Sequence, residues 1–97
     1  EVEVLHLRSL NPLDVDSIVA TVKKTHRALV VHEDKVFGGF GGELVGVINE
    51  HAFEHLDAPV RRVGSTFTPV GFNRILERAT LPDMTKVLVA ARDLLNY

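Results

Sequence analysis

Two short stretches of the sequence have residue types and spacing that could form a metal-binding or anion-binding site. The first reads His-Ala-Phe-Glu-His at residues 51–55. It matches H-x-x-E-H, the inverted zinc-protease pattern. On one continuous helix His51 and His55 share a face, so both imidazoles would bind one zinc while Glu54 acts as the base. A third ligand is also required, and Glu77 is the candidate. Because the neighbouring apolar side chains are assigned to the core, His51 and Glu54 are expected to point outward. A zinc hydrolase therefore stays the remote alternative.

The second stretch is a glycine-rich turn between a predicted strand and a predicted helix. Its members are Gly38, Gly39, Gly41, Gly42 and Glu43. The turn begins as G-x-G, but Leu44 occupies the third glycine position of the dinucleotide fingerprint, and no Gly-Lys-Ser/Thr follows. Backbone N–H groups at a helix start can hold an anion, yet Glu43 already supplies the negative charge that suits this helix end. We predict a structural turn, with an independent flavodoxin-like anion- or nucleotide-binding module as the alternative.

The remaining polar side chains lack the partners that would make a site. His32 follows a predicted strand and is expected to make structural or loop contacts, whereas His6 and His26 are expected at or near the surface. Ser17 and Ser65 lack a nucleophile pattern such as G-x-S-x-G. The absence of cysteine excludes disulfides, thiolate metal sites and a cysteine nucleophile.

Composition limits the partners of this chain. Its net charge of −2 leaves no broad basic field for nucleic acid or anionic lipid, and the basic pairs at 23–24 and 61–62 are isolated. No apolar run approaches the ~18 residues of a membrane span, and the first residues lack the layout of a signal peptide. The length of 97 residues predicts one domain over 1–97. The start in strand-like sequence without Met predicts a piece of a longer chain.

Apolar periodicity predicts three strands, at residues 2–8, 28–33 and 60–64. The predicted helices are one capped by Asp14, one over 43–56, a short one over 73–78 and a last one capped by Asp83. Their core stripes are Val15, Ile18, Val19 and Val22; Leu44, Val45, Ile48, Ala52, Phe53 and Leu56; and Met84, Val87, Leu88, Ala91, Leu94 and Leu95. Alternating strands and helices predict an α/β fold with a mostly parallel sheet. Three short strands make a thin sheet, so part of the sheet is expected to be missing.

Six blocks of the sequence follow one another in an order typical of one family. They span Val4–Asp14, His26–Glu33, Gly38–Glu43, Leu56–Val63, Thr68–Phe72 and Leu81–Asp83. Together they resemble the transketolase C-terminal domain family, and more narrowly the β subunit of thiamine-diphosphate-dependent 2-oxoacid dehydrogenase E1 components. One departure is Gly71, which stands where the family usually has the second proline of x-P-x-P-F.

This resemblance implies a three-layer α/β/α fold with a five-stranded, mostly parallel sheet. Family members usually carry another strand and helix before the strand at 2–8, and that earlier strand lies between the strands at 2–8 and 28–33. The chain is thus expected to lack its first strand–helix unit. Apolar sheet and strand edges would then be uncovered, so the chain is expected to associate or to need the missing segment.

The resemblance also implies where the chemistry lies. The parent enzyme would decarboxylate a 2-oxoacid, pyruvate or a branched-chain acid, with thiamine diphosphate and Mg²⁺, and pass the acyl group to a lipoyl carrier. None of the family's cofactor-contacting or catalytic motifs matches a position here, so this piece is expected to be inactive alone, without catalytic, cofactor-binding or metal residues.

Assembly is the role that the resemblance implies for the domain itself. It is expected to contact other E1 domains and a second copy, and to dock the basic subunit-binding domain of the E2 acyltransferase. Asp57, Asp83 and Tyr97 are the candidate docking residues, because anions would complement a basic partner. The expected location is the bacterial cytoplasm, or the mitochondrial matrix in a eukaryote.

Overall fold

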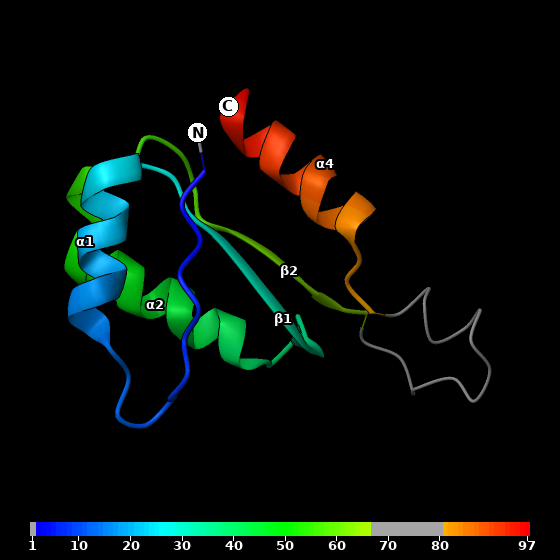
Figure 1. Ribbon diagram of the computed structural model, residues 1–97, viewed down its shortest axis with the longest axis horizontal. Helices are drawn as coiled ribbons and strands as arrows, with labels where there is room; N and C mark the ends of the chain where they lie inside the picture. Colours follow the sequence, from blue (N-terminus) through cyan, green and yellow to red (C-terminus); the bar gives the residue numbers. More distant parts are fainter. Residues whose placement is uncertain (1, 67–80) are drawn as a thin grey trace.

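The computed structural model describes residues 2–66 and 81–97 (Figure 1). Its elements are the helix α1 (Val15–Thr25), the strand β1 (Leu29–Lys35), the helix α2 (Phe40–Ala52), the 3₁₀ turn η1 (Phe53–His55), the strand β2 (Arg61–Ser65) and the helix α4 (Met84–Leu95). The predicted strands at 28–33 and 60–64 and the predicted long helices are therefore formed. The predicted short helix at 73–78 lies outside the described residues. The chain is a small α/β domain, as predicted.

The described strands form one parallel pair, in which Leu29, Val30 and Val31 lie opposite Arg61, Arg62 and Val63. Helix α2 makes the crossover between β1 and β2, and it packs against α1. Val30 of β1 belongs to the same buried cluster as residues of α1 and α2, so these helices cover one face of the sheet. Helix α4 contacts both strands but contributes no residue to that cluster. It lies on the other face (Figure 1).

The core sits between β1 and the α1–α2 pair. Ile18, Val22, Val30, Ile48 and Ala52 form it, and Ala52 is completely buried. Helical spacing of the apolar residues produces this arrangement, because residues three or four positions apart share one helix face. The stripes predicted for α1 and for the first part of α2 are thus confirmed.

Helices α1 and α4 begin at their predicted N-caps. The Asp14 carboxylate accepts a hydrogen bond from the Ser17 backbone N–H at 3.1 Å, and the Asp83 carboxylate accepts one from Lys86 at 2.8 Å. Each bond satisfies an N–H group that has no partner inside the helix. The Ser17 hydroxyl also donates to Asp14 at 2.6 Å, and this bond is the main reason that the pKa of the Asp14 carboxyl lies below its ordinary value.

The predicted strand at residues 2–8 is wrong. This segment forms no strand, and the nearest ladder is an isolated bridge between Leu10 and Leu13. The physical reason is that no described strand lies beside it, although its sequence alternates as strands do. Side-chain bonds hold it to α1 instead, because Glu3 accepts from Thr21 at 2.9 Å and pairs with Lys24 at 2.8 Å. The bonds from Lys24 and Thr21 hold the pKa of the Glu3 carboxyl below its ordinary value.

Core predictions fail for residues of η1 and of α4. Helix α2 stops at Ala52 and gives way to a 3₁₀ turn, so Phe53 is 67% exposed instead of buried. In α4, Leu94 is buried, but Met84, Leu88 and Leu95 are 78%, 48% and 58% exposed. The spacing of the α4 stripe is right, but its flank has no neighbouring helix among the described residues to cover it.

Candidate functional site

The glycine turn joins the end of β1 to the start of α2. Gly38 has a φ of 72°, in the left-handed region that favours glycine. Gly39 is the N-cap of α2, and a methyl group there would overlap the backbone carbonyl of Lys35. Glycine is therefore favoured at residue 38 by its left-handed backbone and at residue 39 by the close approach of the Lys35 carbonyl.

His32 lies beneath this turn and packs against two glycines. A methyl group at Gly41 of α2 or at Gly64 of β2 would overlap its imidazole ring. Both ring nitrogens are buried, and neither has a hydrogen-bond partner within residues 2–66 and 81–97. Ser65, the buried polar residue of β2, donates its hydroxyl proton to the Glu33 carbonyl of β1. These side chains fill space and join elements, in agreement with the structural contacts predicted for His32.

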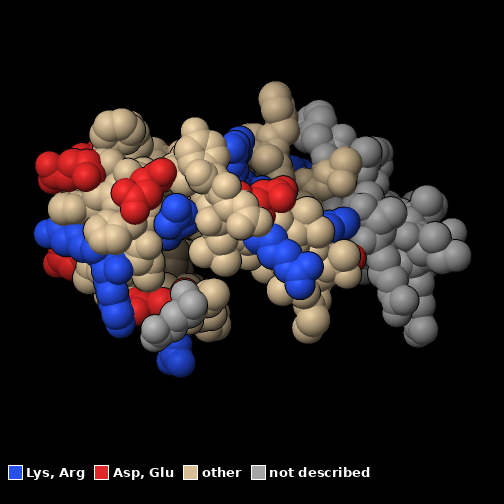
Figure 2. Space-filling view, turned by 90° about the horizontal axis from the view of Figure 1, so that it is seen from above, with Lys and Arg blue, Asp and Glu red and all other residues tan. Residues whose placement is uncertain are grey.

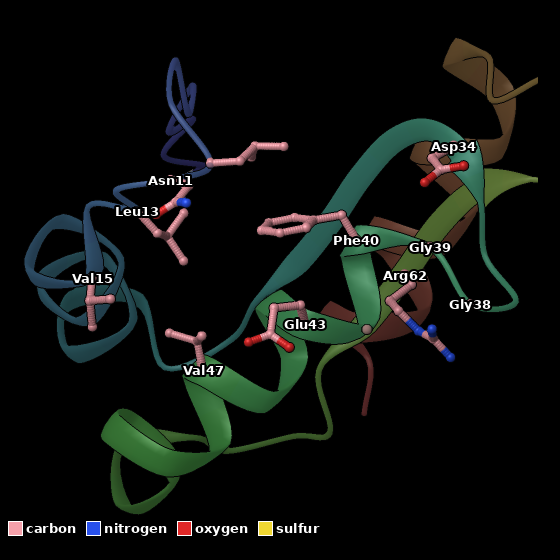
Figure 3. A pocket seen from close by; sticks show the side chains of 12 residues that line it. Asn11, Leu13, Val15, Asp34, Gly38, Gly39, Phe40, Glu43, Val47 and Arg62 are labelled. Atoms are coloured by element: carbon pink, nitrogen blue, oxygen red, sulfur yellow. The ribbon is translucent and has the colours of Figure 1, made fainter.

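An open depression of about 970 Å³ lies beside the turn, between the loop before α1 and the first turns of α2 (Figure 3). It is lined by Leu10, Asn11, Leu13, Val15, Asp34, Gly38, Gly39, Phe40, Gly42, Glu43, Val47 and Arg62. The Phe40 ring and the side chains of Leu13 and Val47 point toward the shared space (Figure 3). The floor of the depression is therefore apolar.

Charges at the rim of this depression do not favour an anion. Asp34 and Glu43 contribute carboxylates, whereas Arg62 is the cation among the lining residues. The Arg62 Nη1 is already bonded to the Val36 carbonyl at 3.0 Å, and its guanidinium points away from the centre of the depression (Figure 3). Two carboxylates would repel a phosphate placed here, and the lining cation that could attract it is already bonded.

The H-x-x-E-H pattern does not form a metal site among the described residues. Because α2 ends at Ala52, His51 and His55 do not lie on one continuous helix. Each imidazole faces the preceding glutamate, with His51 Nε2 at 3.9 Å from Glu50 and His55 Nε2 at 3.6 Å from Glu54. No cluster of three His, Cys, Asp or Glu residues within the described ranges could hold a metal ion. The candidate third ligand, Glu77, lies outside them.

The three candidate docking residues fall into two places. Asp57 follows η1, and its backbone N–H donates to the His26 carbonyl at 2.8 Å. Tyr97 follows α4, and its N–H donates to Leu94 at 3.3 Å. Asp83 begins α4, so a helix of 12 residues, about 18 Å long, separates it from Tyr97. Its carboxylate is also engaged as the N-cap.

A turn at residues 26–27 brings Asp57 and Tyr97 to the same end of the molecule. His26 bonds to the segment that contains Asp57, and the Arg27 Nε donates to the Leu94 carbonyl at 3.1 Å. Figure 1 places the C-terminus at this end, where α1 passes into β1. Figure 2 looks onto this end, where basic and acidic side chains are interspersed without a broad field of one sign. Sequence reasoning missed Arg27, because its partner lies 67 positions away and no local pattern marks the pair.

Comparison with known proteins gives a consistent result. The family model described as "Transketolase, C-terminal domain" matches residues 1–87. The pyruvate dehydrogenase E1 component subunit beta of Porphyra purpurea is 48% identical over 97% of this chain and 28% of its own length. The 2-oxoisovalerate dehydrogenase subunit beta of Pseudomonas aeruginosa is 49% identical over 71% of this chain and 20% of its own length.

A mitochondrial relative extends the series. The pyruvate dehydrogenase E1 component subunit beta, mitochondrial, of Chaetomium thermophilum is 42% identical over 84% of this chain and 22% of its own length. The chain thus spans less than a third of the curated relatives that it matches. It is related to the C-terminal domain of the β subunits of pyruvate and branched-chain 2-oxoacid dehydrogenases. Since the family model covers most of its length, the chain belongs to the transketolase C-terminal domain family.

Proposed function

We propose that this chain is the non-catalytic C-terminal assembly domain of a 2-oxoacid dehydrogenase E1 component, in its β part. The observation that carries the proposal is the similarity to E1 β subunits along 97% of the chain, together with the family match. The parent enzyme would carry out oxidative decarboxylation of pyruvate or a branched-chain 2-oxoacid. Residues 1–97 would then form one domain of a longer protein.

The complete domain in this proposal has three layers and one more strand–helix unit. Two features support this. The segment at 2–9 is extended and exposes Val2 and Val4, and β1 has β2 as its one ladder partner among the described residues. A further parallel strand beside β1 would pair its free edge, and a helix beside α4 would cover Leu88.

Thiamine diphosphate and Mg²⁺ would belong to other parts of the parent enzyme. The described residues do not fit either group, because no cluster of three carboxylate or imidazole ligands exists among them. The rim of the depression beside the glycine turn carries Asp34 and Glu43, which would repel a diphosphate. No reaction step is therefore assigned to this chain, and we expect the isolated domain to be inactive.

The partners in this proposal are other E1 domains, a second E1 copy and the subunit-binding domain of the E2 acyltransferase. Asp57 and Tyr97 are both exposed at one end of the molecule, where a partner can reach them together. Asp83 would make a separate contact. The location would be the bacterial cytoplasm, or the mitochondrial matrix of a eukaryote. None of the helices in the described ranges has the length and apolar run that a membrane crossing needs.

Binding to the E2 subunit-binding domain tests the proposal. The full-length protein, purified with its E1 partner subunit, is titrated with this basic domain in a calorimeter, and its assembly state is measured by sedimentation velocity. We expect stoichiometric binding that weakens as salt increases, because opposite charges meet across the interface. Absence of binding from an assembled and folded protein would contradict the docking role.

The first turn of α2 is the feature that supports the alternative, an anion- or nucleotide-binding module, whereas the rim carboxylates of Asp34 and Glu43 oppose it. The wall of the depression contains this turn, where backbone N–H groups are available. Titration of the same protein with inorganic phosphate and with ATP distinguishes the two functions. Stoichiometric binding that is lost on Gly42→Asp, which adds a carboxylate to the lining where a side chain can be accommodated, would favour the module, whereas no detectable heat favours an assembly domain.

A further inference from the structure

We propose that Arg27 is the positioning residue of the docking surface, because it holds the end of α4 beside Asp57. This inference rests on the proposed function and identifies the residue that joins its two docking contacts. Arg27 is half-buried, and its Nε donates to the Leu94 carbonyl at 3.1 Å. Its role is to fix where the last turn of the chain lies, so it acts on a partner through Tyr97.

The carbonyl that Arg27 binds is the anchor of the terminal turn. Leu94 is the buried residue of α4, with 6% exposure. Its carbonyl also accepts the backbone N–H of Tyr97 at 3.3 Å. A guanidinium at this position complements the partial negative charge at a helix C-terminus and adds a side-chain donor to a carbonyl that otherwise has only backbone N–H donors of the terminal turn. Without Arg27, the terminal turn would be held only by the backbone hydrogen bonds within it.

Residues of the same turn hold the segment that contains Asp57. The His26 carbonyl accepts the Asp57 N–H at 2.8 Å, and the His26 Nδ1 donates to the His55 carbonyl at 2.8 Å. His26 has a φ of 63°, which is rare for a residue with a side chain and requires support from its surroundings. Two consecutive residues thus bind two segments that are far apart in the sequence.

This arrangement creates a surface with defined chemistry. Asp57 is exposed, the side chain of Glu54 is 82% exposed, and Tyr97 is 68% exposed. The Arg27 Nε–H donates to the Leu94 carbonyl, so this N–H is not available to these carboxylates. Because basic side chains are interspersed at this end (Figure 2), one basic side chain of a partner beside an apolar contact, rather than a broad basic surface, would fit the two carboxylates and the tyrosine ring.

The test compares three arginine variants in the full-length protein. Affinity for the E2 subunit-binding domain is measured by calorimetry, and folding is followed by urea denaturation. Arg27→Met removes the bond and is expected to weaken binding about tenfold, because hydrogen bonds to charged groups order the turn before the partner arrives. Arg27→Lys keeps one donor and should recover most of the affinity. Arg8→Met, which removes an exposed charge from the 2–9 segment, should leave the affinity unchanged.

A double-mutant cycle separates positioning from folding. If Arg27 acts through Tyr97, Arg27→Met should have little further effect once Tyr97→Ala is present, so the two losses are not additive. Additive losses, or an Arg27→Met protein that binds as tightly as the wild type, would overturn the inference and leave the docking function intact. If Arg27→Met does not fold, the cycle is run with Arg27→Lys, whose smaller loss of affinity should likewise disappear in the Tyr97→Ala background. A wild-type protein that fails to bind the E2 domain would overturn the docking function and this inference together.

Discussion

The two faces of the β1–β2 sheet differ in how completely the described part of the chain covers them. On one face α1 and α2 pack against each other and against Val30, and the cluster includes fully buried Ala52. On the other face α4 lies alone among the described elements, and Leu88 and Leu95 of its stripe are about half exposed. Val31, next to Val30 in the strand, is 48% exposed. Two helices packed side by side thus bury the apolar side chains of their face, whereas a single helix leaves them partly exposed. We call these the closed face and the open face.

This difference has a simple physical basis. Successive residues of a strand point to opposite faces, so a buried parallel strand needs apolar cover on both sides. The sequence of β1 is apolar on both faces, as Val30 and Val31 show. Among the described residues, a full layer of packed helices covers one of these faces.

The largest expected effect is a difference in the free energy of unfolding between two variants, one from each face of the sheet. Ile48→Ala removes a side chain that is 4% exposed in the closed core, so it should lower the free energy of unfolding by about 3 kcal/mol. Leu88→Ala removes an aliphatic side chain from the open face and should cost less than about 1 kcal/mol. Urea denaturation of both variants measures the difference. Equal losses would mean that the open face is covered in solution.

Substitutions at two glycines of α2 test how tightly the closed face is packed. Gly41→Ala places a methyl group against the buried His32 ring, so we expect a loss of about 1–3 kcal/mol of stability. Gly46 lies in the same helix with no atom within 4 Å of an added methyl group. Gly46→Ala should therefore stabilise the protein by up to about 1 kcal/mol, because alanine favours helix more than glycine. Thermal denaturation is sufficient, and shifts of the same sign would contradict the packing of His32.

Association of the isolated chain is the next expected effect. Exposed apolar residues on α4, and the edge of β1 that pairs with no strand among residues 2–66 and 81–97, should cause residues 1–97 to self-associate at micromolar concentrations. Leu88→Lys combined with Leu95→Lys should reduce association while the unfolding midpoint changes little. Sedimentation velocity at several concentrations measures this. A monodisperse wild-type monomer would show that the open face needs no cover.

The smallest expected effect concerns the segment at 2–9, which is attached to α1 by Glu3. Because Lys24 and Thr21 hold the pKa of the Glu3 carboxyl below its ordinary value, their contribution to stability is present at neutral pH. It should be lost as the pH falls through the lowered pKa, below the ordinary titration range of a glutamate carboxyl. The thermal midpoints of the wild type and Glu3→Gln should therefore differ slightly at pH 7 and converge in acid. A gap that widens on acidification would contradict this sign.

Local chemistry made most of the fold predictable. The caps at Asp14 and Asp83, the stripe that includes Ile18 and the class of the fold all follow from patterns within a few residues, and the structure confirms them. The strand expected at 2–8 failed because a strand requires a neighbour, which a local pattern does not supply. The H-x-x-E-H pattern failed as a site because α2 ends inside it, at Ala52.

The sequence by itself determined the elements, the α/β class and the resemblance to a known family, because helix caps, periodicity and ordered motifs are local properties of the chain. Only the tertiary structure decided which apolar stripes are buried, since burial depends on neighbours far away in the sequence. It also decided that Asp57 and Tyr97 share one end of the molecule while Asp83 lies apart. The bond from Arg27 to Leu94 illustrates the reason, because folding brings together a donor and an acceptor that are 67 residues apart.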